Sequence, residues 1–123
     1  MKFKYFTPPE AHRRLAYIRP VVQDLLDKGK RLQAYVLLPH QTSEIQKQQQ
    51  VLEEEIQALT AELEEVGCYF KDWNFEIGLV DFPAIINSQE ALLCWRSDEP
   101  EVAWYHGYQD GYASRQPIPV ELL

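Results

Sequence analysis

The segment LEEVGCYFK, residues 63–71, separates two kinds of sequence in this 123-residue chain. Before Gly67, apolar residues recur at alternating steps of three and four, which is the spacing of a helix that buries one stripe. After Gly67 the period of the pattern changes to two, which is typical of strands. Gly67 itself suits the left-handed conformation that ends many helices. We therefore expect a helical part over residues 1–67 and a sheet-forming part over residues 68–123, within one domain.

Two long helices are expected in the helical part. The first begins at Thr7, because its side chain can cap the helix and Glu10, three residues later, completes a capping box. It ends near Pro39, since the residue before a proline avoids helical geometry. The second helix begins near Thr42 and ends at Gly67. The short loop between the two predicts an antiparallel hairpin.

Four short strands are expected in the second part, at residues 68–71, 78–82, 90–96 and 101–106. The turns between the later strands are short, which favours an antiparallel meander. The glycines and prolines of residues 107–123 predict a loop there. The predicted fold class is α+β, with a long antiparallel helical hairpin followed by a small antiparallel β-meander.

Composition and charge limit the class of protein. The hydrophobic share of 46% is ordinary for a globular chain, and the formal net charge of -7 argues against nucleic-acid and anionic-membrane partners. No apolar run approaches the ~20 residues that span a bilayer, and the N-terminal sequence lacks the apolar region of a signal peptide. Cys68 and Cys94 form no CxxC pair and predict no disulfide framework. These features favour a soluble, cytoplasmic protein.

Charge is unevenly distributed along the helical part. Basic residues gather in residues 1–19, and six glutamates lie in residues 53–65 without a basic residue among them. An antiparallel hairpin would place Arg14 and Arg19 beside Glu62–Glu65, so we expect these charges to neutralise one another across the helices. The alternative is a basic patch that binds an acidic partner.

Asp81 lies within the apolar run Leu79–Phe82, where a carboxylate is unfavourable unless it is paired. Strand alternation places Arg96 of the next strand within reach, which predicts an Asp81–Arg96 ion pair that fixes the strand register. The alternative is that Arg96 and Arg115 bind an anionic ligand and Asp81 orients one of them, because the arginine fork suits carboxylate and phosphate.

His106 raises the question of a metal site or of acid–base chemistry. A single histidine with Asp81, Glu99 or Cys94 would make a sparse metal site, and the common ligand spacings are missing. A nucleophile built from Cys94 and His106 is disfavoured, because Cys94 lies among apolar residues where burial would raise its pKa. We therefore expect no metal, no cofactor and no catalytic residue. The candidate ligand-binding residues are Asp81, Arg96, Glu99, His106 and Arg115.

Several short segments carry a resemblance to a known family: FTPPEA (6–11), LEEVG (63–67), KD (71–72), GLVDFPA (78–84), LCWR (93–96), EPE (99–101), WYH (104–106), Gly111 and Arg115. Through them, nearly the whole chain resembles domain of unknown function family 2203, which is found in bacteria and archaea. The GLVDFPA and LCWR segments are its specific part. The resemblance implies a small stand-alone prokaryotic protein whose signature residues fall in the sheet. It implies no activity, substrate or cofactor.

A hairpin of this length exposes more apolar surface than the sheet can cover. The first helix would be roughly 45 Å long, and strands of about five residues cannot cover that length. Apolar residues off the main stripe also need burial: Tyr17, Val21, Leu26, Tyr35 and Leu38. We therefore expect a homodimer in which two hairpins form a four-helix arrangement.

Two hypotheses for function follow. The first is a non-enzymatic interaction, scaffold or assembly protein that acts as a homodimer and uses a protein partner. The alternative is a binder of a small anionic ligand, or an enzyme, with a site at Asp81, Arg96, His106 and Arg115. Convergence of these side chains in one concave pocket would favour the alternative.

Overall fold

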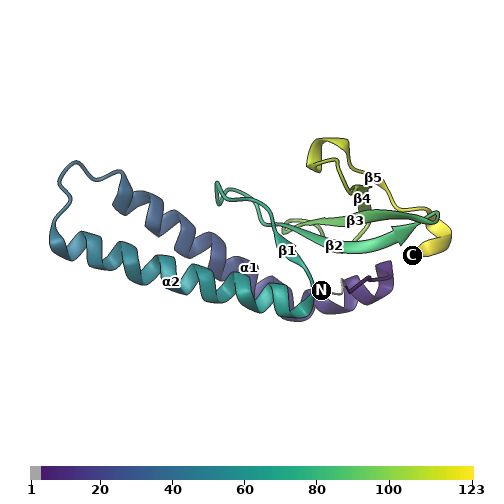
Figure 1. The fold of residues 1–123 in the computed structure, drawn as a ribbon, viewed down its shortest axis with the longest axis horizontal. Helices are drawn as coiled ribbons and strands as arrows, with labels where there is room; N and C mark the ends of the chain where they lie inside the picture. The colour runs from purple at the N-terminus through teal and green to yellow at the C-terminus, as the bar shows by residue number, and fades with distance from the viewer. Residues whose placement is uncertain (1–3) are drawn as a thin grey trace.

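The structure, a computed structural model that describes residues 4–123, consists of two packed helices followed by a five-stranded antiparallel sheet (Figure 1). The helices are α1 (Pro8–Val36) and α2 (Ser43–Val66). The strands are β1 (Tyr69–Phe70), β2 (Leu79–Ile86), β3 (Gln89–Arg96), β4 (Trp104–Gly107) and β5 (Gln116–Pro117). The predicted α+β class, with a helical hairpin and an antiparallel sheet, is confirmed.

The helix boundaries follow the capping signals in the sequence. The Thr7 hydroxyl accepts a hydrogen bond from the Glu10 N–H at 3.3 Å, and the Glu10 carboxylate accepts one from the Thr7 N–H at 2.9 Å. This reciprocal pair is the capping box expected from the sequence. Gly67 ends α2 with a φ of 108°, a left-handed conformation that glycine adopts without strain.

The five strands lie in chain order, and every neighbouring pair is antiparallel. β2 is longer than predicted because it continues through Pro83. The Pro83 carbonyl accepts a hydrogen bond from the Phe6 N–H at 2.8 Å, on the side away from β3. Because the N–H and C=O of one strand residue point to the same side, the missing proline N–H does not interrupt the β2–β3 ladder.

The tail beyond Gly107 is more ordered than the loop that was predicted. It contains two short 3-10 turns, at Tyr112–Ser114 and Val120–Leu122, and the edge strand β5 pairs with β4. Ile118 is buried, and its N–H donates to the Ala103 carbonyl at 2.9 Å. The buried Ile118 therefore holds the tail against the sheet. A single apolar residue among glycines and prolines gives no periodic pattern, so the sequence did not predict this contact.

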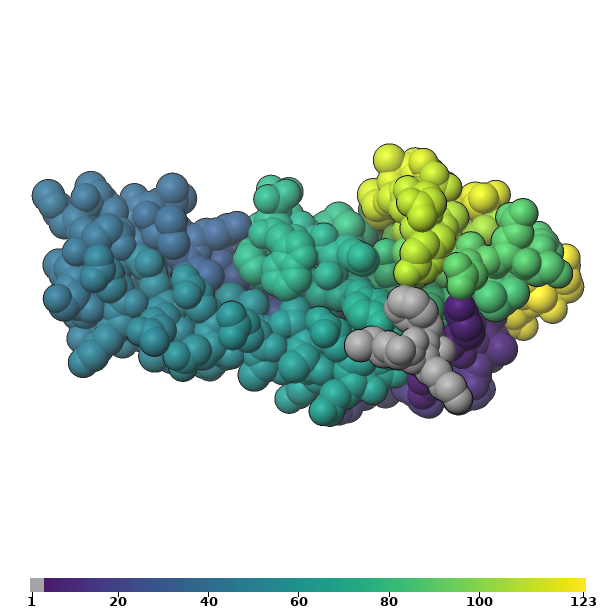
Figure 2. Space-filling model, viewed as in Figure 1, coloured from purple at the N-terminus to yellow at the C-terminus, as the bar shows by residue number. Residues whose placement is uncertain are grey.

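The sheet has two unlike faces. Its inner face packs on the hairpin, and the residues that point there include Val80, Phe82, Leu93 and Trp95, all fully buried in one apolar core with α1 and α2. Its outer face is turned away from the helices (Figure 1). The sheet covers only part of the hairpin, so the loop between α1 and α2 and the adjoining turns project beyond it (Figures 1 and 2).

The basic start of α1 does not pair with the acidic end of α2 as expected. Within residues 4–123, neither Arg14 nor Arg19 forms an ion pair with Glu62–Glu65. Arg19 instead donates to the Pro100 carbonyl at 2.7 Å and lies over the Trp95 ring. Its guanidinium therefore joins α1 to the β3–β4 connection.

Neither α1 nor α2, the two α-helices within residues 4–123, has an apolar stretch long enough to cross a membrane.

Candidate functional site

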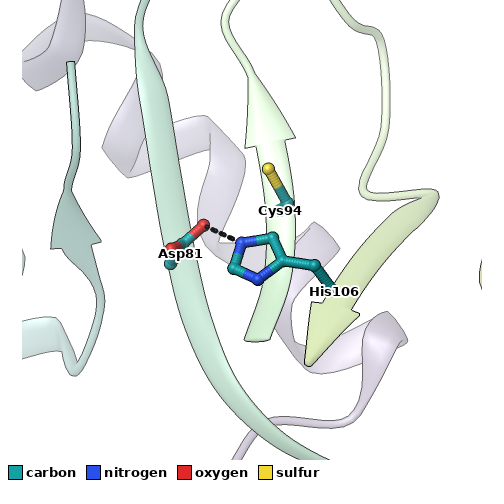
Figure 3. A group of neighbouring side chains, drawn as sticks. All are labelled: Asp81, Cys94 and His106. Carbon is teal, nitrogen blue, oxygen red and sulfur yellow. Dashed lines mark ion pairs between the residues drawn. The ribbon is translucent and has the colours of Figure 1, made fainter. Parts of the chain in front are cut away.

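Three buried polar side chains meet on the outer face of the sheet, one from each of its central strands (Figure 3). Asp81 on β2 is directly opposite Cys94 on β3, and His106 on β4 lies diagonally across from Cys94. Their exposed fractions are 5%, 1% and 2%. One carboxylate oxygen, the sulfur and one imidazole nitrogen all lie within 4.8 Å of one another. We call these three residues the outer-face cluster.

The protonation of His106 is fixed by the backbone. Its Nδ1 lies 2.9 Å from the Gly107 carbonyl oxygen, which can only accept, so Nδ1 carries the proton and donates it. In a neutral imidazole, Nε2 then presents a lone pair, and this atom is 3.4 Å from Asp81 Oδ1. A lone pair and a carboxylate oxygen repel each other. The arrangement therefore requires a proton or a cation between them.

Burial raises the pKa of both acidic members of the cluster. Burial raises the pKa of the Asp81 carboxyl, and the opposing attraction of His106 and Lys71 is smaller. Burial, assisted by the neighbouring Asp81, raises the pKa of the Cys94 thiol to about 12. The rise in the pKa of Cys94 that was expected from its apolar neighbours is therefore found.

A pocket of about 310 Å³ opens above the cluster. All three cluster residues line this outer pocket, together with Lys71, Leu79, Leu92, Tyr108, Asp110, Gly111 and Tyr112. A second, adjoining pocket of about 260 Å³ shares Lys71, Leu92 and Tyr108 with it and is completed by Tyr69 and Pro83. The two pockets adjoin on the outer face, and we call them together the groove: the reactive groups line the first pocket, and Leu92 and Pro83 line the second.

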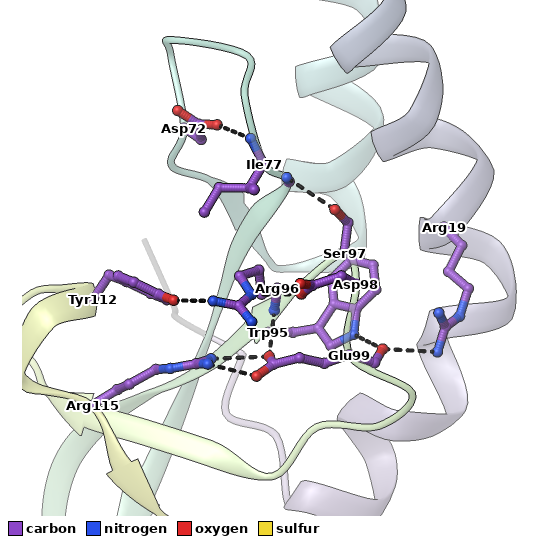
Figure 4. Close-up of polar contacts among 11 residues, drawn as sticks. Arg19, Asp72, Ile77, Trp95, Arg96, Ser97, Asp98, Glu99, Tyr112 and Arg115 are labelled. Carbon is purple, nitrogen blue, oxygen red and sulfur yellow. Dashed lines mark hydrogen bonds and ion pairs between the residues drawn. The ribbon is translucent and has the colours of Figure 1, made fainter.

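The predicted Asp81–Arg96 ion pair is wrong. The register places Arg96 opposite Leu79, two residues beyond Cys94, which is the true neighbour of Asp81. Arg96 lies at the end of β3, where Asp98 in the following turn is closer, and it donates to Asp98 at 2.5 Å and to the Tyr112 hydroxyl (Figure 4).

Glu99 and Arg115 form the other ion pair near the site. The guanidinium donates both of its terminal nitrogens to the carboxylate, at 2.9 and 2.5 Å, and Glu99 also accepts from the Arg96 N–H at 2.8 Å. Such paired bonds are strong and directional. Arg115 lies over the rings of Trp104 and Tyr112, at 4.8 and 4.7 Å from their centroids. Tyr112, a wall of the outer pocket, is therefore held by both arginines (Figure 4).

The five candidate residues thus divide into two groups. Asp81 and His106 belong to the outer-face cluster. Arg96, Glu99 and Arg115 support one wall of the pocket instead, and their charges are paired within the protein, Arg96 with Asp98 and Arg115 with Glu99. Cys94 was considered from the sequence as a metal ligand and as a nucleophile, but it was left out of the candidate residues because it lies among apolar neighbours.

The outer-face cluster has the chemistry of a zinc-type centre. Carboxylate oxygen, thiolate sulfur and imidazole nitrogen are all common zinc ligands, and a histidine ligand usually donates its other N–H to a carbonyl or carboxylate, as His106 does. Ligands ~2.0–2.3 Å from zinc lie about 3.3–3.8 Å apart in a tetrahedron. This range includes the 3.4 Å between His106 and Asp81 and is shorter than the 4.8 Å that bounds the separations among all three ligand atoms. Since all three residues line the outer pocket, a fourth position would face that pocket.

Comparison with known proteins adds the family but no activity. No curated protein and no solved structure matches the chain. The model of the family described as "Uncharacterized conserved protein (DUF2203)" matches residues 4–118, which include both helices, all five strands and the outer-face cluster. The resemblance noted in the sequence is confirmed, and the chain belongs to the DUF2203 family.

Proposed function

We propose that this protein binds one thiophilic divalent cation of the zinc class through Asp81, Cys94 and His106, and presents it to small ligands in the outer pocket. The observation that carries the proposal is the orientation of His106. Its Nδ1–H donates to the Gly107 carbonyl, so its Nε2 lone pair faces the Asp81 carboxylate at 3.4 Å. A divalent cation between these atoms converts the repulsion into two bonds.

Charge balance supports the same proposal. An ionised Asp81 and an ionised Cys94 together carry two negative charges, which one divalent cation neutralises. The adjacent Arg115–Glu99 pair is already neutral. Burying isolated charges is unfavourable by several kcal/mol per ion, so a buried cluster whose charges cancel is far easier to accommodate. Metal binding would also displace the proton that burial otherwise holds on Cys94.

The competing arrangement is a metal-free hydrogen-bonded pair between Asp81 and His106, with Cys94 as an apolar filler. Cobalt distinguishes the two, because a thiolate bound to Co²⁺ gives a charge-transfer band in the near ultraviolet. Titration of chelator-treated protein with CoCl₂ should produce this band and saturate at a single cation per chain. Metal analysis of protein purified without chelator should find zinc or a similar cation bound.

The two cysteines offer a matched control. Both are buried and free, but Cys68 is not part of the outer-face cluster. Cys94→Ser should abolish the cobalt band, and Cys68→Ser should keep it. His106→Gln should weaken cation binding by at least about 100-fold, since even losing a group that merely orients a ligand costs about 10–100-fold. Circular dichroism of each metal-free variant separates lost binding from lost folding.

Failure of the wild-type protein to give a cobalt band would refute the metal centre. So would a band that survives Cys94→Ser in a folded variant. A stable protein that retains neither zinc nor cobalt would leave the Asp81–His106 pair as a structural element of the sheet.

A second proposal, independent of the first, is a homodimer formed through the projecting part of the hairpin. Val21 and Leu26, which were expected to need a partner, are buried within one chain. Leu38 and Val51 remain 43% and 48% exposed. Tyr35 and Leu38 line a shallow surface groove in this part of the hairpin, away from the sheet. A second copy of the same apolar surface is its simplest cover.

A further inference from the structure

We infer that the groove on the outer face binds small monocarboxylates with an apolar body. The carboxylate would take the cation's remaining position in the outer pocket, and the apolar body would lie in the adjoining pocket. This inference rests on the metal centre proposed above and adds to it the chemical class of the ligand. Three features of the groove support this ligand class: its charges, its apolar end and its size.

Lys71 supplies a positive charge in the outer pocket, which the fourth position of the proposed cation would face. It lines both pockets, and its backbone N–H donates to the Leu79 carbonyl at 2.8 Å, which fixes the residue at the edge of β2. With Asp81 neutralised by the cation, Lys71 is the remaining cationic side chain among the described residues of the groove. An anionic ligand group can therefore contact both the cation and the lysine.

Asp110 limits the ligand to a single negative charge. It lies in the tail after β4, whereas Lys71 follows β1, so the sheet order places the two on opposite sides of the groove. A ligand with one carboxylate can direct it toward Lys71 and away from Asp110. A second carboxylate held in the outer pocket would meet Asp110 and be repelled, and one carried into the adjoining pocket would lose its hydration against Leu92 and Pro83.

The adjoining pocket supplies a surface for an apolar body. Leu92 and Pro83 are buried strand residues that form its floor, and Tyr69 and Tyr108 form its sides. Leu92 also lines the outer pocket, so the apolar surface begins beside the metal centre and continues away from it. A hydrocarbon chain attached to a carboxylate in the outer pocket could therefore run over Leu92 into the adjoining pocket.

The size of the groove indicates a small molecule. The two parts measure about 310 and 260 Å³, against roughly 300–1,000 Å³ for typical small-ligand pockets. The wall opposite β1 is formed by the tail that Arg96 and Arg115 hold in place through Tyr112. This wall bounds the outer pocket on one side, which suits the head of a short ligand.

The test uses cobalt-loaded protein and a set of simple carboxylates. Acetate, butanoate and hexanoate are titrated while the cobalt spectrum is recorded, because a new ligand on the cation shifts its absorption. Affinity should rise roughly threefold to fourfold for each methylene that enters the apolar pocket. Succinate, which has the length of butanoate and a second charge, should bind about tenfold more weakly than butanoate.

Variants assign each part of the groove. Leu92→Ala should flatten the dependence on chain length, Lys71→Ala should weaken all three monocarboxylates alike, and Asp110→Asn should reduce the penalty on succinate. Ile85→Ala is the control, since Ile85 is 49% exposed at the end of β2 and lines neither pocket.

The outcomes separate this inference from the proposal on which it rests. If no cobalt band forms, the metal centre itself is refuted. If the band forms but no carboxylate shifts it, the metal centre stands and the ligand class is overturned. Equal affinities for acetate and hexanoate, or a chain-length dependence that Leu92→Ala leaves intact, would also overturn the ligand class.

Discussion

Cys68 and Cys94 are the two cysteines of the chain, and both are buried as free thiols in different surroundings. Cys94 faces a carboxylate and an imidazole, whereas the Cys68 thiol donates to the Leu63 carbonyl at 3.4 Å just after α2 ends. Burial alone therefore does not distinguish a reactive cysteine from a structural one. The neighbours do, and here they make Cys94 a potential ligand and Cys68 part of the core.

The pKa of Cys68 makes the folded protein sensitive to alkali. Burial raises this pKa to about 12 from an ordinary 9.0. Because the folded pKa lies above the unfolded one, the contribution to stability is complete below pH 9 and is lost as pH rises toward 12. The loss at the upper limit is on the order of 4 kcal/mol, or 1.36 kcal/mol for each of three pH units.

Urea unfolding between pH 8 and pH 11.5 measures this loss. Cys68→Ser keeps a donor for the Leu63 carbonyl but does not titrate in this range. The free energy of unfolding of the wild type should fall more steeply with pH than that of Cys68→Ser, since every other titrating group is common to both. Parallel pH profiles would show that the Cys68 thiol is not perturbed.

The packing of α1 against the loop between β1 and β2 depends on one glycine. Gly29 is buried in α1, and a Cβ added there would overlap the ring of Phe75. Phe75 adopts a φ of 58°, and its loop is held by Asp72, whose carboxylate accepts from the Glu76 and Ile77 N–H groups at 2.8 and 2.6 Å. The loop is therefore too constrained to move away easily.

Gly29→Ala should for this reason destabilise the protein, although helix propensity alone would predict that alanine stabilises it. Alanine is better than glycine in a helix by about 1 kcal/mol, but overpacking a fixed core contact costs typically 1–3 kcal/mol. We expect a net loss of about 1 kcal/mol in the free energy of unfolding, measured by urea denaturation. Gly111→Ala is the control, because a Cβ there meets no atom within 4 Å.

Removing the ring tests the stated cause. In a Phe75→Ala background, Gly29→Ala should become stabilising, since only the propensity effect is left. A Gly29→Ala variant that is more stable than the wild type would contradict the contact between the helix and the loop.

For the strands that form the site, the sequence predicted which side chains share a face but not how the strands pair. Alternation placed Cys94 and Arg96 together on one face of β3 and suggested that Asp81 shares it, but it gave no register. The register follows from the two-residue hairpin at Asn87 and Ser88, whose φ angles are 52° and 65°. Counting back from that turn pairs Asp81 with Cys94 directly.

The predicted strand stopped at Phe82, four residues before the end of β2 at Ile86. The connection to the next predicted strand was therefore too long to set the register, although Asn87 and Ser88 were noted as a turn signal. The position of His106 was harder still to predict, because the connection from Ser97 to Ala103 is too long for its one turn, in which the Glu99 N–H donates to the Arg96 carbonyl at 2.8 Å, to set the β3–β4 register. Sequence patterns thus predicted the elements and their order well, whereas the contacts that make the site depend on register, which only the folded sheet reveals.

Exposed apolar residues gather at the end of the helical hairpin, which bears on whether the protein forms a dimer. Around the loop between the helices, Val36, Leu37 and Leu38 are 55%, 81% and 43% exposed. This region lies beyond the sheet, and none of the strands described in residues 4–123 packs over it (Figures 1 and 2). The outer-face groove lies on the sheet instead, so dimer formation through the hairpin and ligand binding would use separate surfaces.

Light scattering coupled to size exclusion tests the proposed homodimer. At tens of micromolar, the wild type should have twice the 14.4 kDa mass of one chain. Leu38→Lys places a charge in the apolar surface of the hairpin and should give monomers, because a buried unpaired charge is strongly unfavourable. Ile85→Lys alters a side chain of similar exposure on the sheet and should leave the dimer intact. A monomeric wild type would refute the dimer, and a Leu38→Lys dimer would place the contact elsewhere than on the projecting hairpin.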